Sequence, residues 1–255
     1  MTLLALLTAT ALAQSSGPSA VLVQANQAYE RSDYAAAISG YEALVAEGHD
    51  TSGVLYNLGN ARLRDGDLAG AIAAYRTAQI QAPRDEDLRA NLAFARTKVV
   101  DAVPPPAPSA VASTLLFWHN RLSPRELAHA ALVFNLLFWL ALAARRLWPT
   151  ADVARYATFA AAPPWLALTG SLLAHSLWPA QLGVIRVAKA PVYAGTSTDA
   201  VVRFELHEGT EAWIRDDRDA WTRIELSNGS DGWLPSDHVQ RIPVRIEPTE
   251  GSPQK

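Results

Sequence analysis

The chain has 255 residues, a formal net charge of −3 and no cysteine. This length allows one or two globular domains. The lack of cysteine excludes disulfides, thiolate nucleophiles and cysteine metal ligands, and without a long basic stripe we do not expect nucleic acid as a partner. Hydrophobic residues make up 49% of the chain, but they are clustered in distinct segments. This clustering indicates that the chain consists of parts with different structures.

The first thirteen residues are typical of a signal peptide. Met1 to Leu12 is apolar apart from threonines, and Ala11-Leu12-Ala13 supplies the small residues of a cleavage site before a polar stretch. We therefore expect residues 1–13 to direct export. A short buried helix or a misassigned start codon is the alternative, because no Lys or Arg precedes the apolar run.

A repeat of about 34 residues follows the signal. Shifting the chain by that length pairs Asp33 with Asp67, Ala37 with Ala71, Ile38 with Ile72 and Tyr41 with Tyr75. Such a period predicts stacked pairs of antiparallel helices. Gly59 and Ala71 would lie where the helices cross closely, while the larger Leu55, Leu58 and Tyr75 would fill the gaps between them.

These positions resemble the tetratricopeptide repeat family. The second unit carries the residues of that motif in order and spacing: Leu55, Leu58, Gly59, Gly66, Ala71, Tyr75, Ala78 and Pro83. The first unit departs from it, with Ala25 in place of a glycine and Leu44 in place of an alanine. Asp85 is expected to cap a further helix that runs to about Val100 and covers the second unit. The resemblance implies an all-α module in residues 18–100, with two units and a capping helix.

In that family the first helix of each unit lines a groove that holds a peptide or a partner protein. The resemblance places these residues on that face: Asn26, Tyr29, Glu30, Tyr56, Asn57, Asn60, Arg64, Asn91, Phe94 and Lys98. Asn26 and Asn57 match two positions of the family's carboxylate clamp. Leu22 and Asp87 stand where that clamp has lysines, so capture of an acidic C-terminus is not expected. A solvated polar face is the alternative interpretation of this set.

Residues 101–122 form the predicted connection to the next module. Four prolines, at positions 104, 105, 106 and 108, favour an extended polyproline II conformation of about 3.1 Å per residue. We expect a semi-rigid spacer that holds the repeats away from a membrane. Leu115 to Trp118 is interpreted as a short segment at the membrane interface.

Two apolar runs within residues 123–180 predict a transmembrane hairpin. Leu127 to Ala144 and Tyr156 to Trp178 carry no formal charge, and each reaches the roughly 18 to 20 residues that span a bilayer core. Gly170 and Ser171 would let the two helices approach closely.

Polar residues predict where the hairpin starts and which way it points. Ser123 and Glu126 form a capping box with a proline between them. Arg145, Arg146 and Arg155 crowd the loop between the spans, which directs that loop towards the cytoplasm. Both soluble modules would then stand on the periplasmic side of a bacterial inner membrane.

From Gly183 the pattern changes to short strands separated by turn residues. We expect five strands, at 184–187, 201–206, 211–214, 221–226 and 232–234, with a turn at Asp216 to Asp219. Five strands in about 60 residues predict a small all-β barrel. The polar residues 243–255 are interpreted as a disordered tail.

Three stretches in this region resemble the bacterial SH3-like domain: Ala190-Pro191-Val192-Tyr193, Leu206-His207-Glu208-Gly209-Thr210 and Gly232-Trp233-Leu234-Pro235. The resemblance covers residues 183–242 and implies binding of cell-wall peptides or docking of proteins. Tyr193, Trp213, Trp221 and Trp233 would line such a surface, or belong to the small core.

The order of the parts resembles the BatE-type proteins of the bacterial aerotolerance (Bat) operon. Residues 84–92 and 206–210 carry this likeness most clearly. The resemblance implies a scaffold or adaptor in an envelope complex, with von Willebrand factor A domain membrane proteins and the MoxR-type AAA+ ATPase system as partners. A cell-wall sensor that binds peptidoglycan through the barrel is the alternative.

Nothing in the sequence predicts catalysis. The six histidines are scattered, without a pair at metal-ligand spacing, and there is no glycine-rich phosphate loop or nucleophile elbow. We therefore expect a multidomain membrane protein that is not an enzyme and needs no metal or cofactor. A hydrolase whose residues converge only in the fold is a third class.

Overall fold

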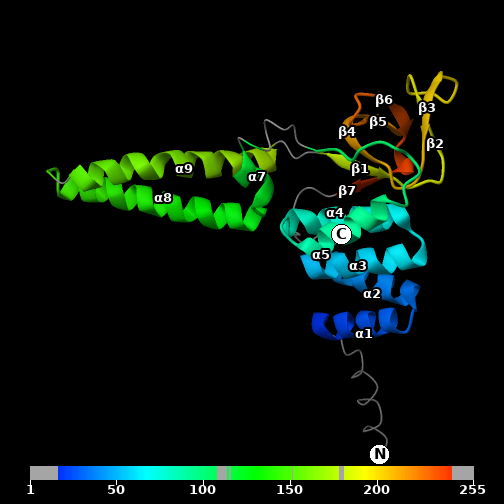
Figure 1. Cartoon of the computed structure of the whole chain (residues 1–255), viewed down its shortest axis with the longest axis horizontal. Coiled ribbons are helices and arrows are strands. Elements are labelled where there is room, and N and C mark those ends of the chain that lie inside the picture. Colours follow the sequence, from blue (N-terminus) through cyan, green and yellow to red (C-terminus); the bar gives the residue numbers. More distant parts are fainter. Residues whose placement is uncertain (1–16, 108–113, 115, 151, 178–180, 243–255) are drawn as a thin grey trace, which may run out of the picture.

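The computed structural model describes residues 17–107, 114, 116–150, 152–177 and 181–242. It has three parts: a stack of helices, a β-sheet over one side of that stack, and a long pair of helices that projects from them (Figure 1). The predicted signal peptide, the predicted tail and Pro108 of the linker lie outside the described residues.

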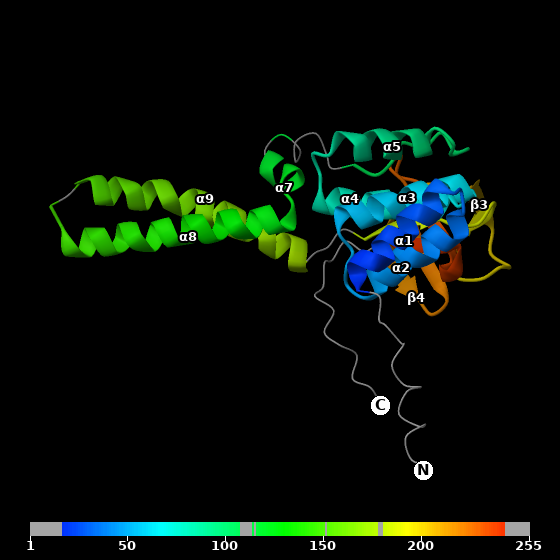
Figure 2. The ribbon, with the colours of Figure 1, turned by 90° about the horizontal axis from the view of Figure 1, so that it is seen from below.

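The stack consists of α1 (Pro18–Glu30), α2 (Tyr34–Ala46), α3 (Ser52–Asp65), α4 (Leu68–Gln81) and α5 (Glu86–Arg96). α1 packs against α2, α3 against α4, and α5 lies against α4 at the end of the stack (Figure 2). Asp33, Asp67 and Asp85 cap three of these helices, because each carboxylate accepts a hydrogen bond from the backbone N–H three residues later. The predicted Asp85 cap is confirmed, although its helix ends at Arg96 rather than near Val100.

Small residues meet where the helices cross, and the two helix pairs use them in opposite order. In the first pair a Cβ added to Gly40 would lie 2.8 Å from Cβ of Ala25. In the second pair, 34 residues later, the glycine is Gly59 and the alanine is Ala74. A Cβ on Gly59 would lie 2.5 Å from Cε1 of Tyr75, which confirms the predicted close crossing. The other predicted packing residues are at most 4% exposed: Leu55, Leu58, Ala71 and Tyr75.

The projecting part consists of the short α7 (Phe117–Arg121) and the long α8 (Pro124–Leu147) and α9 (Asp152–Leu177). α8 and α9 are long and apolar enough to cross a membrane, and only 11% and 22% of their most apolar stretches are buried. The predicted capping box is confirmed. Ser123 Oγ accepts from the Glu126 amide at 3.3 Å, and Glu126 Oε2 accepts from the Ser123 amide at 2.8 Å.

α7 closes the base of this hairpin. Trp118 Nε1 donates a hydrogen bond to Ser171 Oγ of α9 at 2.9 Å, and Trp118 packs with Leu122 near the buried Leu127. This contact of Ser171 is with α7, so a close approach of α8 at Ser171 stays a prediction. Gly170 makes no close contact, because it lies one residue earlier on α9 and is exposed. A Cβ added there would meet no atom of the described residues within 4 Å, so this prediction is wrong.

The third part is an antiparallel sheet with the strand order β3-β2-β6-β5-β4-β1-β7. The strands are β1 (Leu182–Ile185), β2 (Ala190–Tyr193), β3 (Val202–Leu206), β4 (Glu211–Arg218), β5 (Trp221–Glu225), β6 (Asp231–Pro235) and β7 (Val239–Ile242). Its core includes Val192, Leu206, Ile224 and Leu234, each at most 2% exposed. Alternation along the strands directs these side chains to one face of the sheet.

The described residues contain seven strands, whereas the sequence predicts five. β2 and β7 were not predicted. β2 contains a proline, which ordinarily argues against a strand. The predicted turn at Asp216 is also wrong, since Asp216, Asp217 and Arg218 belong to β4. A bulge after Ile214 lets the strand continue, and the chain turns at Asp219, whose φ is 51°.

Residues 101–107, which we call the strap, lie against both the stack and the sheet. Over these residues the predicted semi-rigid spacer is therefore packed on the soluble parts. Four donors hold the strap: Ser227 Oγ to Pro104 O at 2.6 Å, Arg76 Nη2 to Pro106 O at 3.1 Å, and His207 N and Thr210 Oγ1 to Asp101 Oδ2 at 2.7 and 2.5 Å. Val103 packs into the core of the sheet. An extended segment has no internal hydrogen bonds, so its carbonyls pair with neighbouring elements instead.

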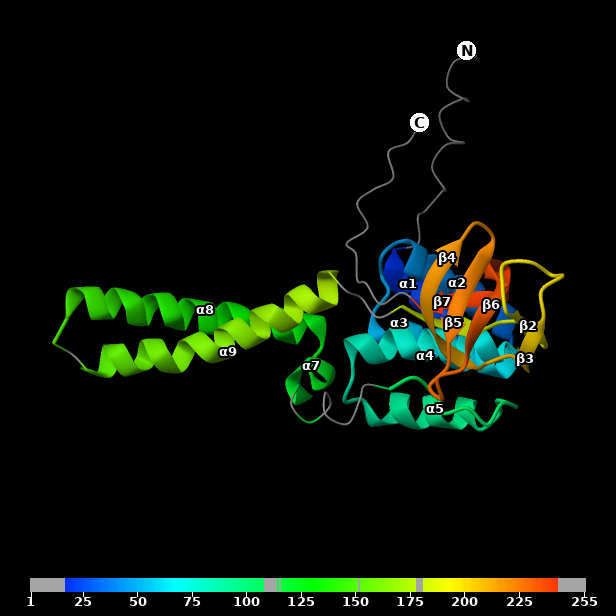
Figure 3. The ribbon, with the colours of Figure 1, turned by 90° about the horizontal axis from the view of Figure 1, so that it is seen from above.

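The sheet lies against the stack (Figure 3). A buried carboxylate joins the two. Glu211 of β4 is 4% exposed and accepts from Arg76 Nε of α4 at 2.5 Å and from Arg96 Nε of α5 at 2.7 Å. Burial lowers the pKa of the Arg76 guanidinium, and the attraction of Glu211 offsets this only in part. Val184 and Ile242 of the sheet are buried in the core of the stack. The stack, the strap and the sheet therefore pack as one continuous body.

Candidate functional site

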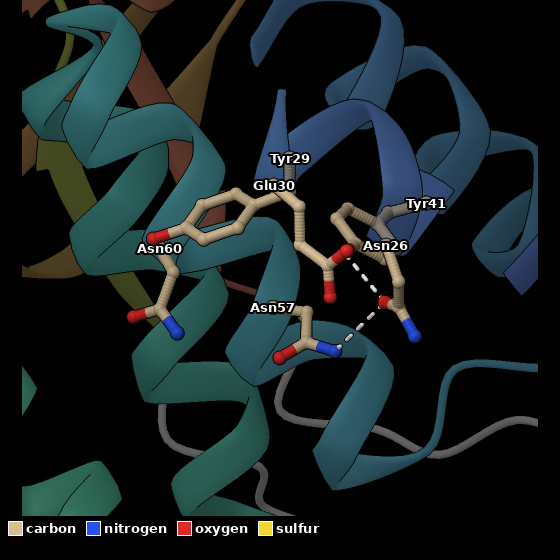
Figure 4. A pocket seen from close by; sticks show the side chains of 6 residues that line it. All are labelled: Asn26, Tyr29, Glu30, Tyr41, Asn57 and Asn60. Atoms are coloured by element: carbon tan, nitrogen blue, oxygen red, sulfur yellow. Dashed lines mark hydrogen bonds between the residues drawn. The ribbon is translucent and has the colours of Figure 1, made fainter. Parts of the chain in front are cut away.

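Two adjoining hollows run along the helix face formed by α1, α3 and α5. The first has a volume of about 220 Å³ and is lined by Asn26, Tyr29, Glu30, Tyr41, Asn57 and Asn60 (Figure 4). The second has a volume of about 480 Å³ and is lined by Tyr29, Asn60, Leu63, Arg64, Tyr75, Asn91, Phe94 and Lys98. Because Tyr29 and Asn60 line both hollows, the two are continuous, and we call them together the groove.

In the first hollow a buried tyrosine fixes the orientation of an asparagine. The Tyr41 hydroxyl of α2 donates to Asn26 Oδ1 at 2.7 Å, and Asn57 Nδ2 of α3 donates to the same oxygen at 3.4 Å (Figure 4). Tyr41 is 1% exposed. Burial raises the pKa of its hydroxyl above the ordinary value, so at neutral pH the group stays protonated and remains a donor.

The second hollow repeats this arrangement 34 residues later. The Tyr75 hydroxyl of α4 donates to Asn60 Oδ1 at 2.7 Å, and Asn91 Nδ2 of α5 donates to the same oxygen at 2.9 Å. Asn91 Nδ2 also donates to the Tyr56 hydroxyl at 2.9 Å. Tyr75 is fully buried, and this burial raises the pKa of its hydroxyl far above the ordinary value.

These networks determine which groups face a ligand. An amide oxygen has two lone pairs, and the Oδ1 atoms of Asn26 and Asn60 each accept two hydrogen bonds. The remaining polar atom of each side chain is Nδ2, which can only donate. Two N–H donors at equivalent positions of successive helix pairs therefore line the groove, and they suit the carbonyl or carboxylate oxygens of an extended peptide.

The groove has an acidic end and a basic end. Glu30 lies at the first hollow, whereas Arg64 and Lys98 lie at the second. All three side chains are exposed. The Lys98 ammonium lies 5.0 Å from the ring centroid of Phe94, which is itself 55% exposed. The basic end therefore offers two cations beside an open aromatic ring.

The structure places nine of the ten predicted groove residues on the walls of the groove. Tyr56 is the tenth and takes part through its hydrogen bond to the second network. Sequence reasoning did not assign Tyr41 and Tyr75 to the site. The sequence nevertheless contains a signal for this role. Tyr41 and Tyr75 are 34 residues apart, and so are Asn26 and Asn60, the asparagines to which they donate.

Three of the four aromatic residues predicted for the surface of the sheet lie together. Tyr193 and Trp221 meet edge to face with ring centroids 5.5 Å apart, and Tyr193 pairs with Trp233 across β2 and β6. Arg218 lies 4.8 Å from the Trp233 ring centroid, and Trp233 is only 8% exposed. Trp213 lies at the other end of the β4–β5 hairpin. The sheet therefore brings together two partly exposed rings and one buried ring.

Within the described ranges, no group of three His, Asp or Glu side chains is placed to hold a metal ion. A comparison with models of protein families and with curated proteins finds no match to this chain. The function of the groove is therefore inferred from the groove's own residues.

Proposed function

We propose that the chain is a membrane-anchored scaffold that holds a partner protein in the groove. One observation carries this proposal: a Tyr–Asn–Asn hydrogen-bond network occurs twice, and both copies face an open hollow. Side chains that are already fixed lose little conformational entropy when a ligand binds, which favours affinity. The likeness of residues 18–100 to tetratricopeptide repeats supports the same function.

The charges in the groove favour one direction for the bound segment. A carboxylate of the partner would lie near Arg64 and Lys98, and a basic group would lie near Glu30. Exposed ion pairs contribute only about 0.2–1 kcal/mol each. The charges therefore mainly orient the segment, while the fixed asparagine donors form its hydrogen bonds.

The hairpin of α8 and α9 supplies the anchor in this proposal. A hairpin returns the chain to the side from which it entered, so the stack and the sheet would stand on one membrane face. An ion pair between Arg84, which follows α4, and Glu126, at the start of α8, holds the stack near the base of the hairpin. Arg145 and Arg146 at the end of α8 and Arg155 at the start of α9 favour the periplasmic face of a bacterial inner membrane for the soluble parts.

The order of the parts supports a place in an envelope complex of the Bat type. The likeness of residues 183–242 to the bacterial SH3-like domain adds a second docking surface, at Tyr193 and Trp221. The partners implied by this resemblance are von Willebrand factor A domain membrane proteins and the MoxR-type ATPase system. Since the groove and the sheet belong to one body, both surfaces would engage such partners in a fixed relative orientation.

The test removes polar side chains from the groove and leaves both buried tyrosine hydroxyls with their acceptors. We expect Asn57→Ala, Arg64→Ala and Lys98→Ala together to abolish recovery of the partner after cross-linking in native membranes. Asn26 and Asn60 are left in place because each accepts from a buried tyrosine hydroxyl. An unsatisfied buried hydroxyl costs about 1–3 kcal/mol, so replacing either asparagine would confuse binding with stability.

The matched control is Arg89→Ala on α5. Arg89 precedes Asn91 by two residues, which turns it about 200° around the helix and away from the groove. Both variants should keep the thermal unfolding midpoint of the unmodified protein, and the control should keep the partner. Full recovery of the partner with the triple variant would show that the groove does not bind the partner.

A further inference from the structure

One end of the hairpin of α8 and α9 points away from the body (Figure 1). That end carries another hollow. It has a volume of about 490 Å³ and is lined by residues near the C-terminus of α8: Trp139, Leu142, Ala143, Arg145 and Arg146. Trp139 is 54% exposed and Leu142 is 36% exposed. The hollow therefore combines an apolar wall with two guanidinium groups at one end.

The charge at this end of the hairpin is not balanced. Asp152 is the single carboxylate among the described residues between Trp139 and Tyr156, and it pairs with Arg155 at 3.1 Å. The C-terminus of α8 carries about half a negative charge from the helix dipole, but the neighbouring N-terminus of α9 carries about half a positive charge. Because these offset each other, the charges of Arg145 and Arg146 remain uncompensated.

The length of α8 determines where these arginines would lie in a bilayer. From Ser123 to Arg145 the helix rises by about 33 Å at 1.5 Å per residue. The hydrocarbon core of a bilayer is about 30 Å thick. If the base of the hairpin lies at one surface, Arg145 and Arg146 reach the headgroup level of the other surface, while Trp139 and Leu142 stay at the depth of the acyl chains.

We propose that this hollow binds one anionic phospholipid, with an acyl chain along Trp139 and Leu142 and the phosphate at Arg145 and Arg146. Guanidinium groups bind phosphate oxygens in a forked geometry, and an anionic lipid balances the positive charge, which a zwitterionic lipid does not. The inference rests on the proposed crossing of the membrane by α8 and α9.

Native mass spectrometry of the full chain in detergent tests this site, with phosphatidylglycerol and phosphatidylcholine of identical acyl chains as probes. We expect a preference for phosphatidylglycerol on the order of twentyfold, because each arginine near anionic lipid contributes a factor of about five. Arg145→Gln with Arg146→Gln should bring the ratio close to one. The matched control, Arg121→Gln with Arg125→Gln, changes two exposed arginines at the opposite end of the hairpin and should keep the preference.

Three results would overturn the site: equal binding of the two lipids, a preference that survives in the Arg145 and Arg146 variant, or displacement of the lipid by an equal concentration of inorganic phosphate. Flotation of the full chain with phosphatidylcholine vesicles separates this claim from the anchor. If the protein floats but shows no lipid preference, the lipid site is refuted and the membrane anchor stands. If the protein does not float, both are refuted.

Discussion

Replacing Glu211 by glutamine should loosen the contact between the sheet and the helical stack. The substitution keeps the shape of the side chain but removes the charge that faces Arg76 and Arg96. Removing one partner of a buried ion pair costs about 3–5 kcal/mol. We take about 3 kcal/mol, because the Arg96 side chain is 27% exposed and can turn to water, whereas that of Arg76 is 16% exposed. The equilibrium between the docked and undocked forms should then shift roughly 150-fold.

Hydrogen exchange at two backbone amides measures this shift. The Ala69 amide donates to Glu208 Oε1 at 3.1 Å, and the His207 amide donates to Asp101 Oδ2 at 2.7 Å. Ala69 lies on the stack and Glu208 on the sheet side, and Asp101 belongs to the strap, so both bonds report docking. When opening and closing are fast compared with exchange, the exchange rates of both amides should rise about 150-fold in Glu211→Gln.

Glu225→Gln is the matched control, since it also neutralises a glutamate that pairs with an arginine. Glu225 pairs with Arg215 at the surface, where the two side chains are 39% and 49% exposed. Such a pair contributes about 0.2–1 kcal/mol, so exchange at the two amides should change by less than about fivefold. An effect of Glu211→Gln no larger than that of the control would refute the reasoning and assign the contact to apolar packing alone.

Gly59→Ala should lower the thermal unfolding midpoint, because its Cβ would collide with Tyr75 and such overpacking costs about 1–3 kcal/mol. Gly53→Ala on the same helix, where an added Cβ meets nothing within 4 Å, should not lower it, and equal midpoints would contradict the packing argument. The strap should loosen in acid: burial raises the pKa of Asp101, but hydrogen bonds from the sheet outweigh this and hold that pKa below its ordinary value. Its carboxylate therefore contributes stability that is present above about pH 4 and lost as pH falls through the lowered pKa. Exchange at the His207 amide should show this loss in the unmodified protein and not in Asp101→Asn, and identical pH profiles would argue against it.

Signals that are local in the chain predict the helical part of this fold well. An aspartate cap depends on residues three positions apart, and the 34-residue period depends on two successive helix pairs. Both can be recognised without knowledge of the rest of the fold. The strap and the buried carboxylate have no such signal. Asp101 and His207 are 106 residues apart, and Arg76 and Glu211 are 135 residues apart. No local sequence pattern indicates a partner at that distance, and a run of prolines alone predicts a semi-rigid spacer.

The candidate site is predicted in outline from the same period, because helical spacing places the asparagines on one face. The sequence does not show which of these asparagines contact the ligand and which stabilise the fold. Asn26 and Asn60 do both, since each accepts from a buried tyrosine hydroxyl. Asn57 only donates to this network. That difference depends on the depth of Tyr41 and Tyr75, which only the packed structure determines.

The central claim is that the groove holds a partner protein. A photo-crosslinking amino acid in place of Phe94, which is 55% exposed at the basic end, tests it most directly in the full chain in native membranes. We predict a discrete crosslinked species that disappears when Asn57, Arg64 and Lys98 are replaced by alanine, and no such species from the same amino acid at Arg89. A Phe94 crosslink that survives those substitutions, or one that forms only from Arg89, would contradict the account.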